Sequence, residues 1–293
     1  MMKRIGIVTE ETANLPPDII EKYRIAVVPV KLDWPDIENL PGENTFQKMR
    51  EAEKRGIKSF GKTSQPSIKD YLDKYKQQLA GFEKVICVSL GSKFSGSYNS
   101  AIQAKNFLKP DEQGRIFNMD SANNSGGQGL AVLKTEEMIE QGISAPEILE
   151  KMKSVLKNIK FFVIMKDYKW IEYSGRISHL AGIILSKMAK SGLRPLLTIK
   201  NGKLSPAGIK SNAKDFPSVL FGQLKSEIEK KKMLGGKIKA AIIHGDDPLG
   251  AERLREMIKK DLKNVEIVFL NLADNVNGVV SGPDAMVLAW IED

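Results

Sequence analysis

The sequence predicts an α/β protein of two domains, an N-terminal domain with a parallel sheet and a C-terminal domain of mixed α/β structure. Short apolar, β-branched runs alternate with helical patterns through the first half, as in parallel sheets. The second half contains Asn201-Gly202 between two strand-like runs, the signal of a β-hairpin. A chain of 293 residues that is 42% hydrophobic is long enough for two buried cores.

The elements of the first half follow from local patterns. Strands are expected at residues 5–8, 26–32, 85–90 and 116–119. Helices are expected after Pro16-Pro17-Asp18, through Ala101 and Leu108, and through Leu130 and Ile139 after a glycine-rich turn at 126–129. The carboxyl ends of such strands form one edge, where open α/β sheets place their ligands.

The second domain begins after a long helix. Ser144-Ala145-Pro146-Glu147 has the spacing of a capping box and opens this helix, which we expect to connect domains at 1–158 and 159–293. A strand at 161–165, a hairpin at 196–204 and a strand-helix-strand unit at 239–270 follow. The segment 180–189 is apolar nearly all round, so its helix should be buried or face an apolar cavity, and burial in the core is the favoured interpretation.

Composition bounds the class of protein. The net charge is +9, but the lysines alternate with glutamates on helix faces and no arginine cluster is interleaved with aromatic residues, so we expect no nucleic-acid partner. The single cysteine, Cys87, lies in an apolar strand and is expected in the core, as in a reducing cytoplasm. No signal peptide or membrane span is expected, so the predicted location is cytoplasmic.

Two enzymatic alternatives can be formulated. Residues 56–63 match the spacing of a nucleotide-binding P-loop, yet a helical pattern precedes them and Pro66 follows, which favours an accidental match. A serine acyl hydrolase with Ser95 as nucleophile is the other, although only His179 and His244 are available as bases and no nucleophile elbow is present. One cysteine and two distant histidines also make a metal site improbable, so no catalytic residue and no metal ligand is predicted.

Two segments rich in hydroxyl groups, residues 62–67 and 95–100, are the most informative feature. The second lies between the strand at 85–90 and a helix, so Ser95 and Gly96 should stand at a helix N-terminus, a natural anion site. Taken alone, an ordinary helix cap is the favoured interpretation. Hydroxyl donors without a nearby base are suited to holding a carboxylate rather than attacking a carbonyl.

These segments resemble motifs of the DegV family of fatty-acid-binding proteins, and the resemblance covers the whole chain. The motifs are Thr63-Ser64-Gln65-Pro66, Ser95-Gly96-Ser97-Tyr98, Gly175-Arg176-Ile177-Ser178, the opening segment 8–16 and Gly282-Pro283-Asp284-Ala285. The resemblance implies a long-chain fatty acid bound between the two domains, with no other cofactor. It implies that the carboxylate is held by Thr63, Ser64, Ser95 and the Gly96 amide, and that Ile183, Ile184 and Met188 line the acyl tunnel.

The resemblance also implies a partner, an ATP-dependent fatty acid kinase that phosphorylates the carboxylate of the presented acid. By its position in the third motif, Arg176 is the residue that the resemblance implies would face that kinase. The chain departs from the family pattern at Val280, where many members have histidine, at Lys210, where an arginine follows the hairpin, and at Asp284, where glycine is usual. Glu10 and Glu11 replace an Asp-Ser pair. The first two departures concern kinase coupling and the others the mouth of the pocket, so lipid binding is the safer expectation.

Overall fold

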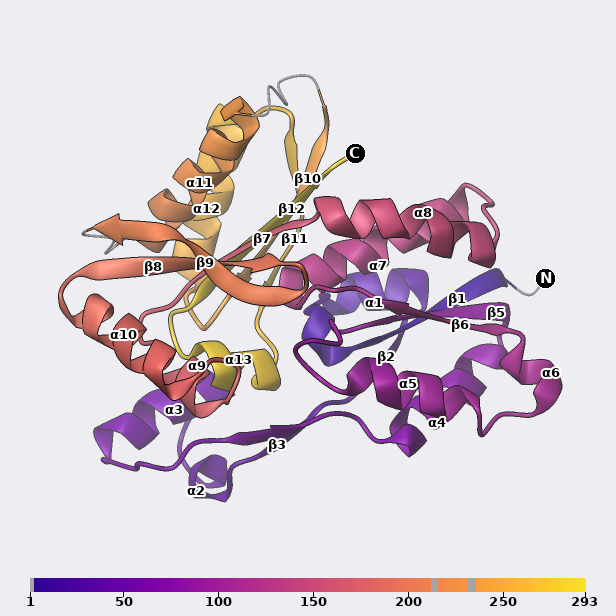
Figure 1. Cartoon of the computed structure of the whole chain (residues 1–293), viewed down its shortest axis with the longest axis horizontal. Helices are drawn as coiled ribbons and strands as arrows, with labels where there is room; N and C mark the ends of the chain where they lie inside the picture. The colour runs from indigo at the N-terminus through magenta and orange to yellow at the C-terminus, as the bar shows by residue number, and fades with distance from the viewer. Residues whose placement is uncertain (1–2, 212–214, 231–235) are drawn as a thin grey trace. The chain divides into compact units, whose positions relative to one another are not determined.

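The computed structural model describes residues 3–211, 215–230 and 236–293 (Figure 1). The elements up to residue 140 are β1 (Lys3–Glu10), η1 (Glu11–Ala13), α1 (Pro17–Tyr23), β2 (Ala26–Val28), β3 (Lys31–Asp33), α2 (Pro35–Glu38), α3 (Thr45–Lys54), β4 (Lys62–Ser64), α4 (Ile68–Leu79), β5 (Phe82–Ser89), α5 (Ser97–Lys105), α6 (Pro110–Gln113), β6 (Ile116–Asp120) and α7 (Ser125–Glu140). The remaining elements are α8 (Ala145–Asn158), β7 (Lys160–Ile164), α9 (Lys169–Tyr173), α10 (His179–Lys190), β8 (Leu193–Lys200), β9 (Lys203–Ser211), α11 (Phe216–Lys230), β10 (Ile238–His244), α12 (Pro248–Asp261), β11 (Val265–Leu272), α13 (Asn275–Ser281) and β12 (Met286–Glu292).

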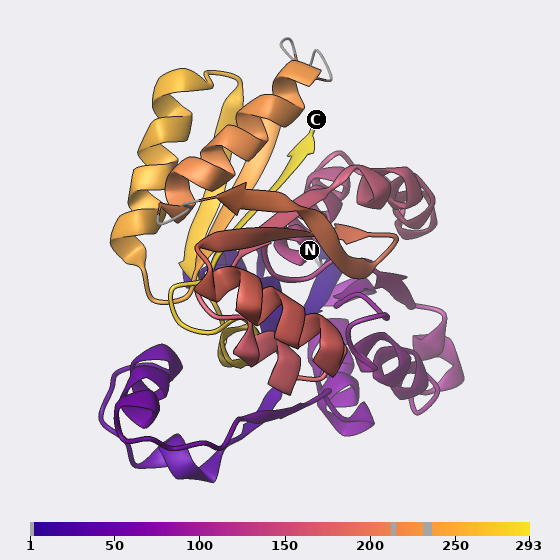
Figure 2. The same ribbon diagram turned by 60° about the vertical axis from the view of Figure 1, so that its left-hand side comes forward.

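The chain forms two compact units. Unit 1 comprises Met1–Lys31, Ser64–Ile159 and Lys200–Lys203, and unit 2 comprises Leu32–Thr63, Lys160–Ile199 and Leu204–Asp293. The division expected at 158/159 assigned residues 32–63 to the first domain, whereas the structure groups them with unit 2. These residues form α2 and α3, at the end of the ribbon made by β3 and β4 (Figure 2).

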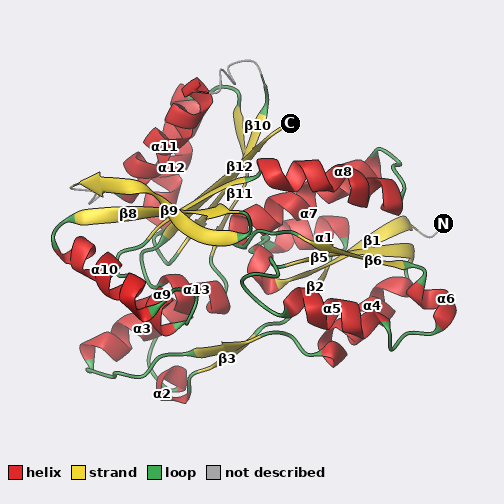
Figure 3. Ribbon diagram, viewed as in Figure 1, coloured by secondary structure: helices red, strands yellow, loops and turns green. Residues whose placement is uncertain are grey.

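Unit 1 is built on a four-stranded parallel sheet in the order β2-β1-β5-β6. The helices α4 and α5 cover one face of the sheet, and α7 and α8 cover the other (Figure 3). The first face is packed by fully buried side chains, including Val8, Tyr71, Tyr75 and Cys87. Because all four strands run parallel, their carboxyl ends at Glu10, Val28, Ser89 and Asp120 lie along one edge.

Unit 2 is built on a mixed six-stranded sheet in the order β11-β10-β12-β7-β8-β9. The pair β10 and β11 is parallel, while β12 runs antiparallel to both of its neighbours, β10 and β7. The helices α11 and α12 pack on this sheet through a core that includes Leu220, Leu254 and Trp290. The sheet therefore has the mixed character that the sequence predicts.

Several predicted elements are confirmed. The helix α1 begins at Pro17, α8 begins after Ser144 with a capping box, and β10, α12 and β11 form the strand-helix-strand unit. Asn201 and Gly202 both have positive φ, 51° and 71°, as a two-residue hairpin turn requires. Cys87 is fully buried, and burial raises the pKa of its thiol to about 12. Within the described ranges, none of the helices combines the length and apolar character needed to cross a membrane.

Other local expectations were wrong. The run expected as one strand at 26–32 is divided between β2 and β3, because β3 pairs with β4 rather than with the parallel sheet. The glycines at 126–129 are not a turn but the first turns of α7, which begins at Ser125 after the cap Asn124. The helix α5 ends at Lys105, before Leu108. The central strand β12 and the helix α13 were not anticipated.

Candidate functional site

In unit 1 the second hydroxyl segment stands at the start of α5. Gly96 is the N-cap, and the Ser95 hydroxyl accepts a hydrogen bond from the Ser97 backbone amide at 3.2 Å. The Ser95 and Ser97 hydroxyls are themselves 2.9 Å apart. The helix N-terminus expected at Ser95 and Gly96 is therefore confirmed, with hydroxyl groups gathered at its amide end.

Gln65 joins the two hydroxyl segments within unit 1. Its Nε2 donates to Ser100 Oγ at 3.0 Å, and its amide group lies directly over Gly96. A Cβ at position 96 would come within 2.6 Å of Gln65 Cδ, so the Gln65 side chain would have to move if residue 96 were not glycine. The sequence analysis predicted a ligand beside Gly96 and did not predict the contact with Gln65, although Gln65 belongs to the same motif as Ser64.

A buried carboxylate lies at the same sheet edge. Glu10, at the end of β1, is 1% exposed and accepts hydrogen bonds from the Tyr71 hydroxyl, from the Leu90 amide at 3.0 Å and from Gln128 Nε2 at 2.6 Å. Burial raises the pKa of the Glu10 carboxyl above its ordinary value. Because Tyr71 lies on α4 and Leu90 precedes the loop to α5, Glu10 ties together the elements that carry the two hydroxyl segments.

In unit 2 the site is a hydroxyl paired with a cation. Arg176 Nη2 donates to Thr63 Oγ1 at 2.7 Å, and Nη1 donates to the Ser174 carbonyl oxygen at 2.7 Å. Arg176 forms no ion pair within the part of the chain that the structure describes, and burial alone lowers the pKa of its guanidinium. A partly desolvated cation that no carboxylate neutralises is a suitable partner for an anionic ligand.

Aromatic packing fixes both members of this pair. Phe60, three residues before Thr63, stacks on Tyr173 with ring centroids 3.6 Å apart and contacts Trp170 edge-on at 5.3 Å. Trp170 in turn lies against Gly282, whose φ of +78° and contact with the indole leave no room for a side chain. The motifs around Thr63, Arg176 and Gly282 thus meet in one unit for a packing reason that sequence could not reveal.

The helix α10 is not the core helix that its composition predicted. Gly182 is its one buried residue, whereas Leu180 and Ile184 are 68% and 50% exposed. Ile183 and Met188, the other two residues expected to line an acyl tunnel, are half-buried. Apolar side chains left at the surface of one helix are available to an apolar ligand.

The enzymatic alternatives find no support. Residues 56–63 run from the end of α3 into β4, the reverse of the strand-to-helix order that a P-loop needs. His179 pairs with Glu172 at 2.5 Å, and His244 Nδ1 accepts from the Asp247 amide at 3.1 Å, so each described histidine has a partner other than Ser95. The described residues contain no cluster of His, Cys, Asp and Glu that could hold a metal.

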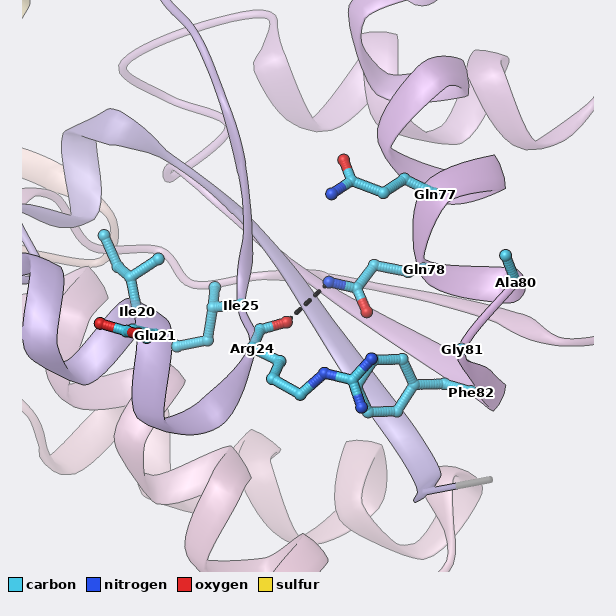
Figure 4. A pocket seen from close by; sticks show the side chains of 9 residues that line it. All are labelled: Ile20, Glu21, Arg24, Ile25, Gln77, Gln78, Ala80, Gly81 and Phe82. Atoms are coloured by element: carbon cyan, nitrogen blue, oxygen red, sulfur yellow. Dashed lines mark hydrogen bonds between the residues drawn. The ribbon is translucent and has the colours of Figure 1, made fainter. Parts of the chain in front are cut away.

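Each unit also has a surface cleft. The cleft of unit 1, about 540 Å³ in volume, lies where α1 and α4 end, and its walls include Glu21, Arg24 and Phe82 (Figure 4). This cleft adjoins the start of β5, at the edge of the sheet opposite to the one that carries the hydroxyl segments. Within it, Gln78 Nε2 donates a hydrogen bond to the Arg24 carbonyl oxygen at 2.8 Å. The cleft of unit 2, about 670 Å³, is lined by basic and acidic side chains in similar number. The walls of both clefts mix charged or polar side chains with apolar ones.

Comparison with known proteins places this geometry in a family. The profile of the DegV family, described as uncharacterised proteins, matches residues 4–293. A protein of Thermotoga maritima named fatty acid-binding protein is 28% identical over 273 residues, which cover 90% of this chain and 89% of the relative. A DegV family protein from Thermus thermophilus, solved in a study of its fatty acid binding, has a TM-score of 0.83 at 24% identity and covers 99% of this chain and 100% of its own. A further T. maritima structure, said to reveal a fatty acid binding function, has a TM-score of 0.78 at 25% identity, with both chains covered completely.

Proposed function

The chain belongs to the DegV family, and from this premise we propose that it binds one long-chain fatty acid and acts as a carrier rather than as a catalyst. The relatives described above are named for fatty acid binding. The observation that carries the proposal is the Thr63–Arg176 pair, because it combines a hydroxyl and a cation without an acidic partner among the described residues.

The proposed head-group ligands are the hydroxyls of Thr63, Ser64 and Ser95 with the Gly96 amide. A carboxylate accepts hydrogen bonds only, and each of these groups is a donor, so their chemistry is matched. A hydrogen bond to a charged group contributes about 1.5–3 kcal/mol. Arg176, already bonded to Thr63, adds the positive charge that a neutral donor set lacks.

The proposed acyl-chain surface includes Ile183, Ile184 and Met188 on α10. Leu180 and Ile184 are exposed and Ile183 and Met188 are half-buried, an unfavourable state that burial of an acyl chain would relieve. Each buried methylene contributes about 0.8 kcal/mol, so roughly ten methylenes contribute about 8 kcal/mol. The tail therefore supplies most of the affinity and the polar end sets the orientation.

Presentation of the bound acid to a fatty acid kinase stays a prediction. Its proposed residue, Arg176, is engaged with Thr63, which supports a role in ligand binding. Val280 lies on α13, half-buried, where many family members have a histidine. The side chain of Lys210, the other departure relevant to the kinase, lies outside the described residues.

The direct test is to denature the purified protein in organic solvent and to identify any released small molecule by mass spectrometry. We expect one fatty acid per chain, either co-purified or after incubation with a panel of free fatty acids. No bound acid in either case would overturn the proposal.

A second test assigns the head-group residues. The double variant Thr63→Ala/Ser95→Ala should remain folded but release the acid faster, because two charge-assisted hydrogen bonds are lost. Ser191→Ala is the matched control, since Ser191 is an exposed hydroxyl at the end of α10 that donates only to the Met188 carbonyl. Equal release rates in the double variant and the control would remove Thr63 and Ser95 from the site.

A further inference from the structure

A cluster of ion pairs in unit 2 joins α3 to two loops that are distant in sequence. Arg50, on α3, contacts Asp246 Oδ2 through Nη1 at 2.5 Å and Asp284 Oδ1 through Nη2 at 2.6 Å. Lys166 Nζ contacts the other oxygen of Asp284 at 2.7 Å, and Asn44 Nδ2 donates to Asp246 Oδ1 at 2.9 Å. The guanidinium is thus held between two carboxylates, each of which has a second partner.

The two aspartates are held in strained conformations that point to a specific role. Asp246 and Asp284 have φ values of 64° and 63°, in the left-handed region, which costs a non-glycine residue about 1 kcal/mol or more. The loops that carry them are joined by backbone hydrogen bonds, Asp284 N to Gly245 O at 2.7 Å and Gly245 N to Ala285 O at 2.8 Å. At position 284 a glycine would adopt this φ freely, so aspartate gains its advantage from the ion pairs.

Further contacts place α3 on the same part of unit 2. Phe46 is 1% exposed and packs against the backbone at Gly245 and Gly278, where a Cβ would come within 3.2 and 2.8 Å of its ring. The Thr45 hydroxyl donates to Asn275 Oδ1 at 2.6 Å. The segment 32–63 is therefore fastened at α3, and its last residue is Thr63, which Arg176 contacts.

We propose that Arg50, Asp246 and Asp284 form a latch that fixes segment 32–63 on unit 2 and thereby holds Thr63 beside Arg176, which makes Arg50 a positioning residue for the ligand head group. This inference rests on the proposed fatty acid binding. The link is mechanical: eight residues, Phe60 among them, lie between the end of α3 and Thr63, so a displaced α3 disturbs the Phe60 contacts and lets β4 and Thr63 shift. The latch acts on the lifetime of the complex, because release requires Thr63 to leave the head group.

The first experiment measures release of a fluorescent fatty acid from the delipidated, reloaded full-length protein. Arg50→Ala should release the acid about five- to tenfold faster, a value between those of exposed and buried ion pairs. Arg50→Lys should recover part of this loss, because an ammonium cannot bridge both carboxylates as a guanidinium does. Arg55→Ala is the matched control, since it removes a 2.6 Å arginine-carboxylate pair with Glu51 that lies within α3 itself.

The second experiment replaces the latch by a covalent bond. Thr45→Cys/Asn275→Cys joins α3 to α13 without touching the ion pairs, and Cys87 is buried and does not compete. In the Arg50→Ala background, the oxidised cross-link should restore slow release, and reduction should abolish the rescue. Added salt should accelerate release from the wild-type protein more than from the oxidised protein, because screening of Arg176 is common to both proteins and only the wild-type protein depends on the Arg50 ion pairs to hold α3.

The outcomes separate the two proposals. If the wild-type protein retains no fatty acid, the proposed function fails. If it retains the acid but Arg50→Ala releases it at the rate of Arg55→Ala, or if a formed cross-link does not rescue Arg50→Ala, the latch is overturned while fatty acid binding stands. Should Arg50→Ala fail to fold, the salt dependence of the wild-type protein with and without the cross-link decides the question.

Discussion

The unneutralised cation at Arg176 leads to a prediction about head-group selectivity. In the variant Arg176→Met, a bound carboxylate loses a charge-assisted hydrogen bond of about 1.5–3 kcal/mol, which corresponds to about 10- to 150-fold weaker binding of a fatty acid. The fatty alcohol of the same chain length carries no charge, so its affinity should change by less than about threefold. The acyl tail contributes about 0.8 kcal/mol per methylene to the binding of both ligands, so their affinities for the variant remain measurable.

The assay is competition against a fluorescent fatty acid on delipidated protein, with acid and alcohol titrated side by side. Arg176→Lys should fall between wild type and Arg176→Met, because a lysine keeps the charge without the planar fork. Lys187→Met controls for net charge, since Lys187 is exposed on α10 of the same unit. The stability of the unliganded Arg176→Met protein should stay within about 1 kcal/mol of wild type, because relief of the desolvated charge offsets two lost hydrogen bonds. An equal loss of affinity for acid and alcohol would refute the reasoning, since it would indicate a merely structural role.

Three further predictions test the surroundings of the site. Because burial raises the pKa of Glu10, the folded state holds its proton more tightly than the unfolded state, so the stability linked to Glu10 is present below the unfolded pKa and falls as the pH rises through the folded pKa. The unfolding free energy of Glu10→Gln relative to wild type should therefore increase in urea titrations as the pH rises from the unfolded pKa through the folded pKa, and a difference that does not change with pH would contradict this. Gly282→Ala should lower the free energy of unfolding by at least about 3 kcal/mol, because of the positive φ of Gly282 and its contact with the Trp170 ring. Gly142→Ala should lower it by about 1 kcal/mol, because Gly142 has a φ of 77° but open space around it. Similar losses in the two variants would argue against the indole contact. Ile184→Asp should weaken fatty acid binding at least about tenfold, whereas Leu249→Asp, on a side chain 84% exposed in the same unit, should not, and equal effects would remove α10 from the acyl site.

Local patterns predicted most of the fold, because capping boxes, Asn-Gly turns and β-branched runs act over a few residues. The failures come from competing signals within short segments. The glycines at 126–129 favour a turn by composition, but Asn124 and the following apolar residues allow a helix to start there. The strand β12 is apolar and buried from Met286 to Ile291, as a strand inside the sheet requires, and this pattern alone does not distinguish a strand from a buried helix.

The candidate site shows the same limit at longer range. Hydroxyl segments at strand and helix ends are visible in the sequence, since Ser95 and Gly96 need only their neighbours to form a helix N-terminus. The Arg50 cluster joins residues 196 and 234 positions apart, and the contact of Arg176 with Thr63 spans 113 positions. Neither has a periodicity or spacing that sequence reasoning could detect. The aromatic stack of Phe60 on Tyr173, which fixes both sides of that contact, was equally invisible.

The departures from the family pattern acquire a physical explanation. A second carboxylate about 4 Å from a bound fatty acid carboxylate would cost about 4 kcal/mol near a protein surface, unless its charge were compensated. The negative charge of Asp284 is compensated by Arg50 and Lys166, and their hydrogen bonds and charges lower the pKa of its carboxyl. The Glu10 carboxyl is buried beneath three hydrogen-bond donors, the Tyr71 hydroxyl, the Leu90 amide and Gln128 Nε2. Asp284 and Glu10 therefore each have partners that limit the repulsion between their carboxylates and an anion.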